Sequence, residues 1–270
     1  MDWKRVCDQI PEVVKSVKNE YILNNTIIKD DIFPILEKHC VVVYYPIPDE
    51  TKNRGFHIKR FLNGELRDFV YINTANNIAE QIFAAAHELG HVWRVAEKVW
   101  QKAGEVEELT DEIEERIVGR FAAELLMPAT EFKRTFFSHI NDLELNSSQI
   151  RFEEIIRVMV MQMTDYMVPY EAVRRRMIET SIISDEIGKS LNAEEIPGIN
   201  VIVSAYLRDL YTALEESSGK KTIPGLRDLL FKAESSGAVS EYVISKIKED
   251  FSVEGVSPTD KIIHISAEGE

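Results

Sequence analysis

The stretch His87-Glu88-Leu89-Gly90-His91 decides how this chain folds, because a helix built around it must face a second element that completes a metal site. Four residues separate His87 from His91, so a helix places both imidazoles on one face, one turn apart. Glu88 can reach a water on a metal held there. The stretch therefore predicts two nitrogen ligands and a general base on one helix. Apolar and small residues recur around it at helical spacing, namely Ile78, Ile82, Phe83, Ala86, Leu89, Gly90 and Trp93.

The alternative interpretation is a helix with two surface histidines and an acidic neighbour. Two features of the same stretch argue against it. Small residues, Ala84 to Ala86, directly precede the motif, and Gly90 lies inside it. Glycine inside a helix costs about 1 kcal/mol relative to alanine, so its presence indicates that another element approaches closely. We therefore favour a metal site.

A catalytic zinc ion takes a third protein ligand and leaves a fourth position for water. Residues 111–127 predict a second helix, which ends before Pro128 and carries Glu115 on the same stripe as apolar residues. Glu115 is therefore the predicted third ligand, and Glu112, on the same stripe, is the second choice. Gly119, one turn after Glu115, is expected to let the two helices approach. Glu124 is left open between a partner that supports the ligands and a solvated residue.

These residues resemble the ImmA/IrrE family of metallopeptidases. The segment Phe83 to His91 looks like the family's F-x-x-A-H-E-L-G-H, and Phe121 to Pro128 reads FAAELLMP, nearly letter for letter as in the family. Glu115, six residues before Phe121, falls where that pattern carries its third metal ligand. The resemblance extends upstream to the segment ending at Asn73 and downstream to about residue 180. Two departures stand out: Val118-Gly119 replaces the family's usual Ala-Asn, and no further histidine follows the motif in residues 92–95.

The resemblance implies a zincin-like fold and a zinc-dependent endopeptidase, with His87, His91 and Glu115 holding Zn²⁺ and Glu88 as the catalytic base. It also implies that the protein substrate is a helix-turn-helix transcriptional repressor, cleaved to relieve repression. The donor set alone does not distinguish zinc from manganese or iron, since two imidazoles and one carboxylate also suit non-haem iron. Zinc is the expectation for hydrolysis.

The composition is that of an ordinary globular protein. The chain has 270 residues, of which 44% are hydrophobic and 29% charged. No run of 18 apolar residues and no secretory apolar core occur, and only two cysteines are present, so we expect a cytoplasmic protein without membrane contact. The formal net charge of −14 disfavours a broad nucleic-acid interface.

The remaining pattern predicts an α+β fold that is mainly helical. Three strands, over residues 41–45, 56–62 and 67–72 with a hairpin turn at 63–64, predict a small, mainly antiparallel sheet that leads straight into the metal helix. We expect three parts: a zincin-like core with an N-terminal helix over 1–140, a helix-turn-helix-like segment over 141–185, and a C-terminal helical module of unknown role over 186–270. Further helices are expected over 2–24 with a kink or break at Pro11, over 32–39, 129–137 and 170–179, and in the last third over 201–216, 224–235 and 240–251, with a linker or lid over 181–200 and a strand or tail at 261–265.

Several polar residues have two interpretations. Tyr45, Tyr71 and His57 are candidates to stabilise the oxyanion, although an exposed strand position is the favoured interpretation of His57. His39 and His139 are expected at the surface. In zincin-like folds an edge strand holds the extended substrate, and which strand does so here is open.

Two other classes of function compete with the peptidase. One is a non-catalytic zincin-like protein that docks a repressor or toxin without cutting it. The other is a transcription regulator that contacts DNA through Arg174 to Arg176 on a helix-turn-helix-like segment. Three arginines in an acidic chain are thin support, so direct nucleic-acid binding is not expected.

Overall fold

The computed structural model describes residues 1–21, 27–48, 54–62, 64–146 and 149–253. The chain forms two compact units, Met1–Lys220 and Lys221–Glu270. The divisions expected at residues 140 and 185 both fall inside the first unit, where helices on either side of each division pack together. Among the described helices, none is long and apolar enough to cross a membrane.

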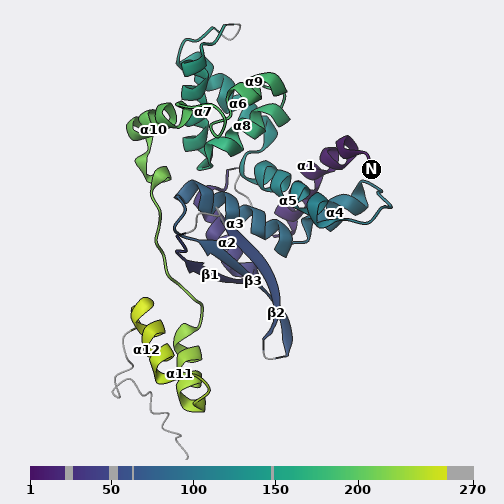
Figure 1. Cartoon of the computed structure of the whole chain (residues 1–270). Coiled ribbons are helices and arrows are strands. Elements are labelled where there is room, and N and C mark those ends of the chain that lie inside the picture. Colours follow the sequence, from purple (N-terminus) through teal and green to yellow (C-terminus); the bar gives the residue numbers. More distant parts are fainter. Residues whose placement is uncertain (22–26, 49–53, 63, 147–148, 254–270) are drawn as a thin grey trace, which may run out of the picture. The chain divides into compact units, whose positions relative to one another are not determined.

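The first unit is mainly helical, and several of its helices begin where a side chain caps free backbone N–H groups. Asp2 accepts from Lys4 and Arg5, Asn77 from Glu80, and Thr110 from Ile113. The elements in chain order are α1 (Trp3–Glu20), η1 (Lys29–Asp31), α2 (Ile32–His39), α3 (Ile78–Val92), α4 (Val95–Lys102), α5 (Asp111–Leu126), α6 (Ala129–Asp142), α7 (Phe152–Tyr166), α8 (Tyr170–Glu179), α9 (Asp185–Ser190), α10 (Ile199–Leu210) and η2 (Thr212–Glu215), and Figure 1 labels most of them.

The sheet has three strands, β1 (Val41–Tyr45), β2 (Gly55–Leu62) and β3 (Glu65–Asn73), in the order β1-β3-β2. β2 and β3 form the predicted antiparallel hairpin, in which Leu62 pairs with Glu65. The β1–β3 pairing is parallel, so the sheet is mixed and the expectation of a mainly antiparallel sheet needs correction. β3 lies in the middle because the chain leaves β1, forms the outer strand β2 and returns between them. The predicted mainly helical α+β class is confirmed.

Helix α3 packs against β2 and β3 on one side and against α5 on the other. Successive residues of a strand point to opposite faces, so Gly55 and His57 share a face with their β3 partners Ile72 and Val70. Ile72 and Val70 are buried. α3 covers this face of the sheet, since the His57 ring stacks on the ring of His91 in α3.

Gly90 sets the close approach of α3 to α5. A Cβ atom at this position would lie 2.8 Å from Val118 Cγ1 and 3.1 Å from Phe121 Cδ1, both on α5. Gly119 does not have the predicted role, because a Cβ there would meet no atom within 4 Å. The glycine that admits the neighbouring helix therefore belongs to the metal motif itself.

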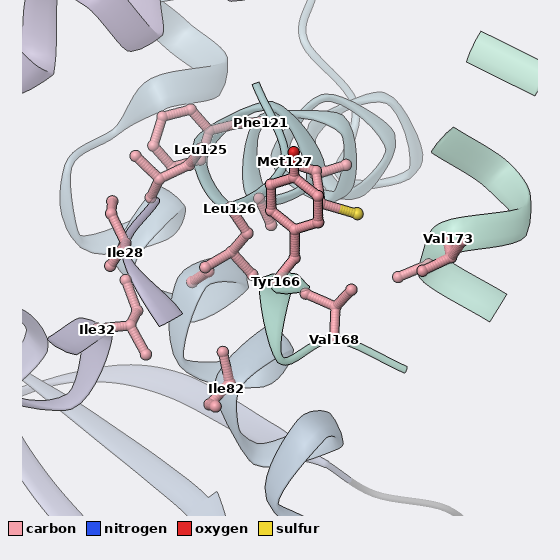
Figure 2. Packing of buried hydrophobic residues seen from close by; sticks show 14 of the residues in the cluster. Ile28, Ile32, Ile82, Phe121, Leu125, Leu126, Met127, Tyr166, Val168 and Val173 are labelled. Atoms are coloured by element: carbon pink, nitrogen blue, oxygen red, sulfur yellow. The ribbon is translucent and has the colours of Figure 1, made fainter. Parts of the chain in front are cut away.

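The core continues from α5 in two directions. Figure 2 shows Phe121, Leu125 and Leu126 of α5 in one buried cluster with Ile28 and Ile32 from the N-terminal region. The same cluster includes Tyr166, the last residue of α7, Val168, which follows that helix, and Val173 of α8, all of them fully buried. Because residues of the N-terminal region and residues of α7 and α8 share this core with α5, they hold α5 in place from several sides.

Local patterns misplaced two features. α1 continues unbroken through Pro11, because Val6, Ile10, Val13, Val14 and Val17 are buried along one face and hold the helix in place. The predicted linker over 181–200 contains the short helix α9, which Ser184 caps and which begins within a few residues of α8. The part of the first predicted helix that extends past residue 21 lies outside the described residues.

An extended segment, residues 216–220, lies beside the start of α3. The Ile78 N–H donates to the Glu216 carbonyl at 2.9 Å, and the Gly219 N–H donates to the Thr74 carbonyl at 3.1 Å. The Ser218 hydroxyl donates to the Gln81 side chain at 2.8 Å. This segment therefore satisfies a backbone donor in the first turn of the metal-motif helix.

The second unit contains α11 (Leu226–Ser236) and α12 (Glu241–Asp250). Leu230 and Ile244 are its buried apolar residues among those described, and Lys248 of α12 pairs with Glu234 of α11 at 2.5 Å. The strand or tail expected at 261–265 lies outside the described residues.

The two glycines provide a matched stability test. Gly90→Ala is expected to lower the free energy of unfolding by about 1–3 kcal/mol, because the added carbon overpacks the α3–α5 contact. Gly119→Ala is expected to raise it by up to about 1 kcal/mol, because alanine favours the helix and meets no neighbour. Chemical denaturation followed by circular dichroism measures both. Equal shifts in the two variants would contradict this packing.

Candidate metal centre

Three donor atoms converge between α3 and α5. His87 Nε2 lies 3.0 Å from Glu115 Oε2, and His91 Nε2 lies 3.2 Å from Glu115 Oε1. The two imidazole Nε2 atoms are 3.3 Å apart. All ligand atoms of this group lie within 4.8 Å of one another, so a single ion between them can reach every donor.

The donor set fits a divalent metal. Two imidazoles on one helix and a carboxylate from a second helix form the His₂Glu arrangement of catalytic zinc sites, which leaves a coordination position open. Glu115 is the predicted third ligand, and the structure brings it, rather than the second choice Glu112, to the histidines. Each candidate ligand comes from a regular helix, so its backbone position is well defined.

Glu114 is a partner that sequence reasoning missed. Its Oε1 atom lies 3.0 Å from His91 Nδ1, on the side of the ring away from the triad. A ligating histidine commonly donates its second ring N–H to a carboxylate, which fixes the tautomer and orients the ring. The signal was present in the sequence, since a second acidic residue stands directly beside Glu115 and this role requires one.

Burial and hydrogen bonds shift the pKa values of two residues of the site. Burial lowers the pKa of His91, although the hydrogen bond that its ring donates to Glu114 opposes the shift, and the lowered pKa favours the neutral imidazole that binds metal. The hydrogen bond from His87 lowers the pKa of Glu115, which favours the carboxylate. Both directions match the states that the proposed ligands need.

Glu88 lies on α3, on the side of the site that faces β2, and is 6% exposed. Burial raises the pKa of its carboxyl to about 7, with Glu115 raising it further and His87 opposing the shift. Gly55, at the start of β2, passes close by: a Cβ there would lie 2.7 Å from the Tyr71 carbonyl oxygen and 3.5 Å from Glu88 Oε1. Gly55 therefore lets β2 pass close to Tyr71 and Glu88, where a side chain would clash with the Tyr71 carbonyl.

His57 is not the exposed strand residue that was expected. Its ring stacks on His91 with centroids 6.1 Å apart and an angle of 11° between the planes. Its Nε2 atom lies 2.6 Å from Asp68 Oδ1, and its side chain is 15% exposed. The contact of His57 with His91 joins β2 to α3, and local sequence spacing does not show it.

The two tyrosines considered with His57 lie on the other face of the sheet. Tyr71 pairs with Phe56, the neighbour of His57, and consecutive strand residues alternate between faces. Tyr45 shares the face of Tyr71, and the Tyr71 hydroxyl donates to the Tyr45 carbonyl at 2.9 Å. Of the three candidates for oxyanion stabilisation, His57 is the one placed at the metal centre.

Glu124 has a structural role that neither expectation covered. It forms a buried ion pair with Arg176, whose Nε also donates to the Met127 carbonyl at 2.9 Å. Glu124 further accepts from the Ala129 N–H at 3.3 Å. These bonds tie α8 to the end of α5.

The arginines of α8 are largely committed within the protein. Arg174 donates to Glu171 and to the Gly188 carbonyl, and Arg176 is buried against Glu124. Arg175 is exposed but also pairs with Glu171. The segment therefore lacks the free basic face that the DNA-binding hypothesis requires.

Two further histidines, His39 and His139, are not free surface residues either. The His39 ring contacts Tyr21 and Trp93, with centroids 4.5 and 5.4 Å away. His139 Nε2 lies 2.7 Å from Asp165, and its side chain is 14% exposed. Both stabilise contacts between elements, away from the metal group.

Comparison with known families decides the relationship. Residues 36–177, more than half of the chain, match the family model described as the IrrE N-terminal-like domain, a peptidase family. The chain belongs to this family. The matched region contains α3 and α5 with the His87, His91 and Glu115 group, so membership supports a metallopeptidase type of function with a protein substrate. None of the curated proteins matches the chain.

The role of Glu114 yields a prediction with an internal control. Glu114→Ala is expected to weaken metal affinity by about 10–100-fold, because the His91 ring loses the carboxylate that orients it. Glu112→Ala removes an acidic residue from the same helical turn without touching the group and is expected to leave affinity unchanged. Competition with a chromophoric chelator measures both. Equal affinities for the two variants would refute an orienting role.

Proposed function

We propose that this IrrE-type protein is a zinc-dependent endopeptidase in which His87, His91 and Glu115 hold the metal. The observation that carries the proposal is the convergence of three donor atoms beside a buried carboxylate, Glu88. Bound zinc would lower the pKa of its water toward about 7 and polarise the scissile carbonyl. Family membership supports the same class of reaction.

Glu88 is the proposed general base. A group whose pKa lies near the working pH can both accept and return a proton, and burial raises the pKa of Glu88 to about 7. It would take a proton from the attacking water and deliver it to the leaving amine. The backbone of Gly55 passes close to the Glu88 carboxyl, so β2 packs directly beside the proposed base.

β2 is the strand that we propose holds the substrate. It is an edge strand, it packs against α3, and it brings Gly55 to Glu88 and His57 to His91. An extended peptide can add to such an edge through main-chain hydrogen bonds, which would bring its carbonyl to the metal. His57, oriented by Asp68, is then the nearby side chain best placed to contact the polarised oxygen.

The proposed substrate is a helix-turn-helix transcriptional repressor, whose cleavage would relieve repression in the cytoplasm. This assignment rests on the resemblance to the ImmA/IrrE metallopeptidases. The internal pairing of Arg174 and Arg176 supports an action on a regulator protein over direct contact with DNA.

The metal assignment predicts a stoichiometry. The purified chain is expected to bind about one zinc ion, and Glu115→Ala is expected to lose it because one of three protein ligands is removed. Inductively coupled plasma mass spectrometry measures the metal, with Glu112→Ala as the control that retains it. Equal zinc content in the Glu115 variant and the parent would exclude this ligand set.

The mechanism predicts a separation of binding from cleavage. Glu88→Gln is expected to keep its zinc and to cleave a repressor substrate about 10²–10⁴-fold more slowly, because the amide cannot accept the proton. Co-expression with candidate repressors, followed by mass spectrometry of the fragments, measures cleavage, and a chelator should stop it in the parent. Full cleavage by the zinc-bound variant would refute the mechanism. A repressor that is retained but never shortened would favour a docking protein.

A further inference from the structure

A cavity of about 490 Å³ opens directly beside the candidate metal centre. Two of the proposed ligands, His87 and Glu115, form part of its wall. The rest of the wall comes from Phe83 of α3 and from α1, α5 and α8, which lie far apart in the sequence. A peptide bond held at the metal therefore places one of its neighbouring side chains at the mouth of this cavity.

Small residues of α5 and α8 line the cavity and leave its volume unfilled. Glu115, Gly119 and Ala123 are spaced by four residues, so they lie along one face of α5. A Cβ at Gly119 would meet no atom within 4 Å, and Ala172 lines the cavity from α8. Gly119, which does not serve helix packing, thus leaves space in the cavity.

The charges around the cavity are mostly positive. Arg116, Arg120 and Arg175 line it, against Glu179 and the ligand Glu115. Glu179 is already shared, because it lies 3.6 Å from Arg120 and 3.2 Å from Arg176.

Among the three arginines of the cavity, Arg116 is the one without a carboxylate partner in the described part of the chain. Its guanidinium carbon lies 3.9 Å from the centroid of the Trp3 ring, which holds the group by a cation–π contact. In the described part of the chain no carboxylate forms an ion pair with it. Stacking on Trp3 keeps the planar donors oriented while leaving their edges available, and this geometry suits a carboxylate.

We propose that this cavity receives a substrate side chain next to the scissile bond and that this side chain carries a carboxylate, which Arg116 binds. The inference rests on the proposed peptidase function and deepens it by naming a substrate feature. With Glu115 committed to the metal, the cavity wall has three arginines and one already paired carboxylate, so lysine and arginine side chains are disfavoured there. Trp3 and Phe83 would contact the aliphatic part of the side chain.

The test is a digest of an unbiased peptide library by the zinc-loaded chain, with cleavage sites assigned by mass spectrometry. The parent is expected to enrich aspartate and glutamate at one fixed position beside the cleaved bond. Arg116→Glu is expected to reduce that enrichment roughly tenfold and to favour lysine and arginine at the same position, since a charged hydrogen bond becomes a repulsion. Arg134→Glu is the control, because Arg134 is an exposed α6 residue outside the cavity, and its profile should match the parent.

A second variant separates the pocket from folding and from the metal. Gly119→Leu adds a side chain whose Cβ meets no atom within 4 Å and which favours the helix, so the chain should fold and keep its zinc. The filled cavity should replace the acidic preference by glycine, alanine or serine at the same position. An unchanged profile in this variant would overturn the assignment of the cavity.

Peptide termini distinguish an acidic side chain from the carboxylate of a free C-terminus. Internal acidic residues should direct cleavage equally well in peptides with free and with amidated C-termini, and a requirement for the free terminus would overturn the side-chain proposal. Cleavage by the parent without an acidic preference, or with one that Arg116→Glu leaves intact, would refute this inference alone. No cleavage of any peptide or repressor would refute the proposed function, and this inference with it.

Discussion

The close approach of α3 to α5 at Gly90 is the contact on which the rest of the structure depends. A hydrogen atom in place of a side chain lets Val118 and Phe121 rest against the backbone of α3. Glu115 lies one turn before Val118, so the same contact brings its carboxylate to the two histidines. A metal group with ligands from two helices needs that spacing, and the buried cluster around Phe121 maintains it.

Burial shifts the pKa values of the site residues, which the arrangement of the helices alone would not do. The same loss of water raises the pKa of Glu88 and lowers that of His91, because each shift avoids a charge in an apolar setting. A carboxyl buried in this way is unfavourable for stability and is therefore typical of a functional site. Packing of α3 between the sheet and α5 thus shapes both the position and the proton affinity of the site.

Helix α8, after the core, lines the same cavity as His87 and Glu115. The buried pair of Arg176 and Glu124 fixes α8 against α5, and α8 then forms a wall of the cavity beside the ligands. From the other end of the chain, Trp3 completes that wall and holds Arg116. Segments on both sides of the metal motif therefore define the surroundings in which a substrate would be selected.

The sequence by itself determined the elements whose signals are local. The His87 and His91 pair, the helix of Glu115 and the bounds of α2 and α8 follow from helical periodicity, capping residues and prolines, all of which act over a few residues. The tertiary structure decided the rest: the parallel β1–β3 pairing, the place of His57 beside His91, the bond from Glu114 to His91, the open side of Gly119 and the cavity. These features depend on which strands pair and which helix faces meet, and neither choice is encoded in the spacing of residues along one element.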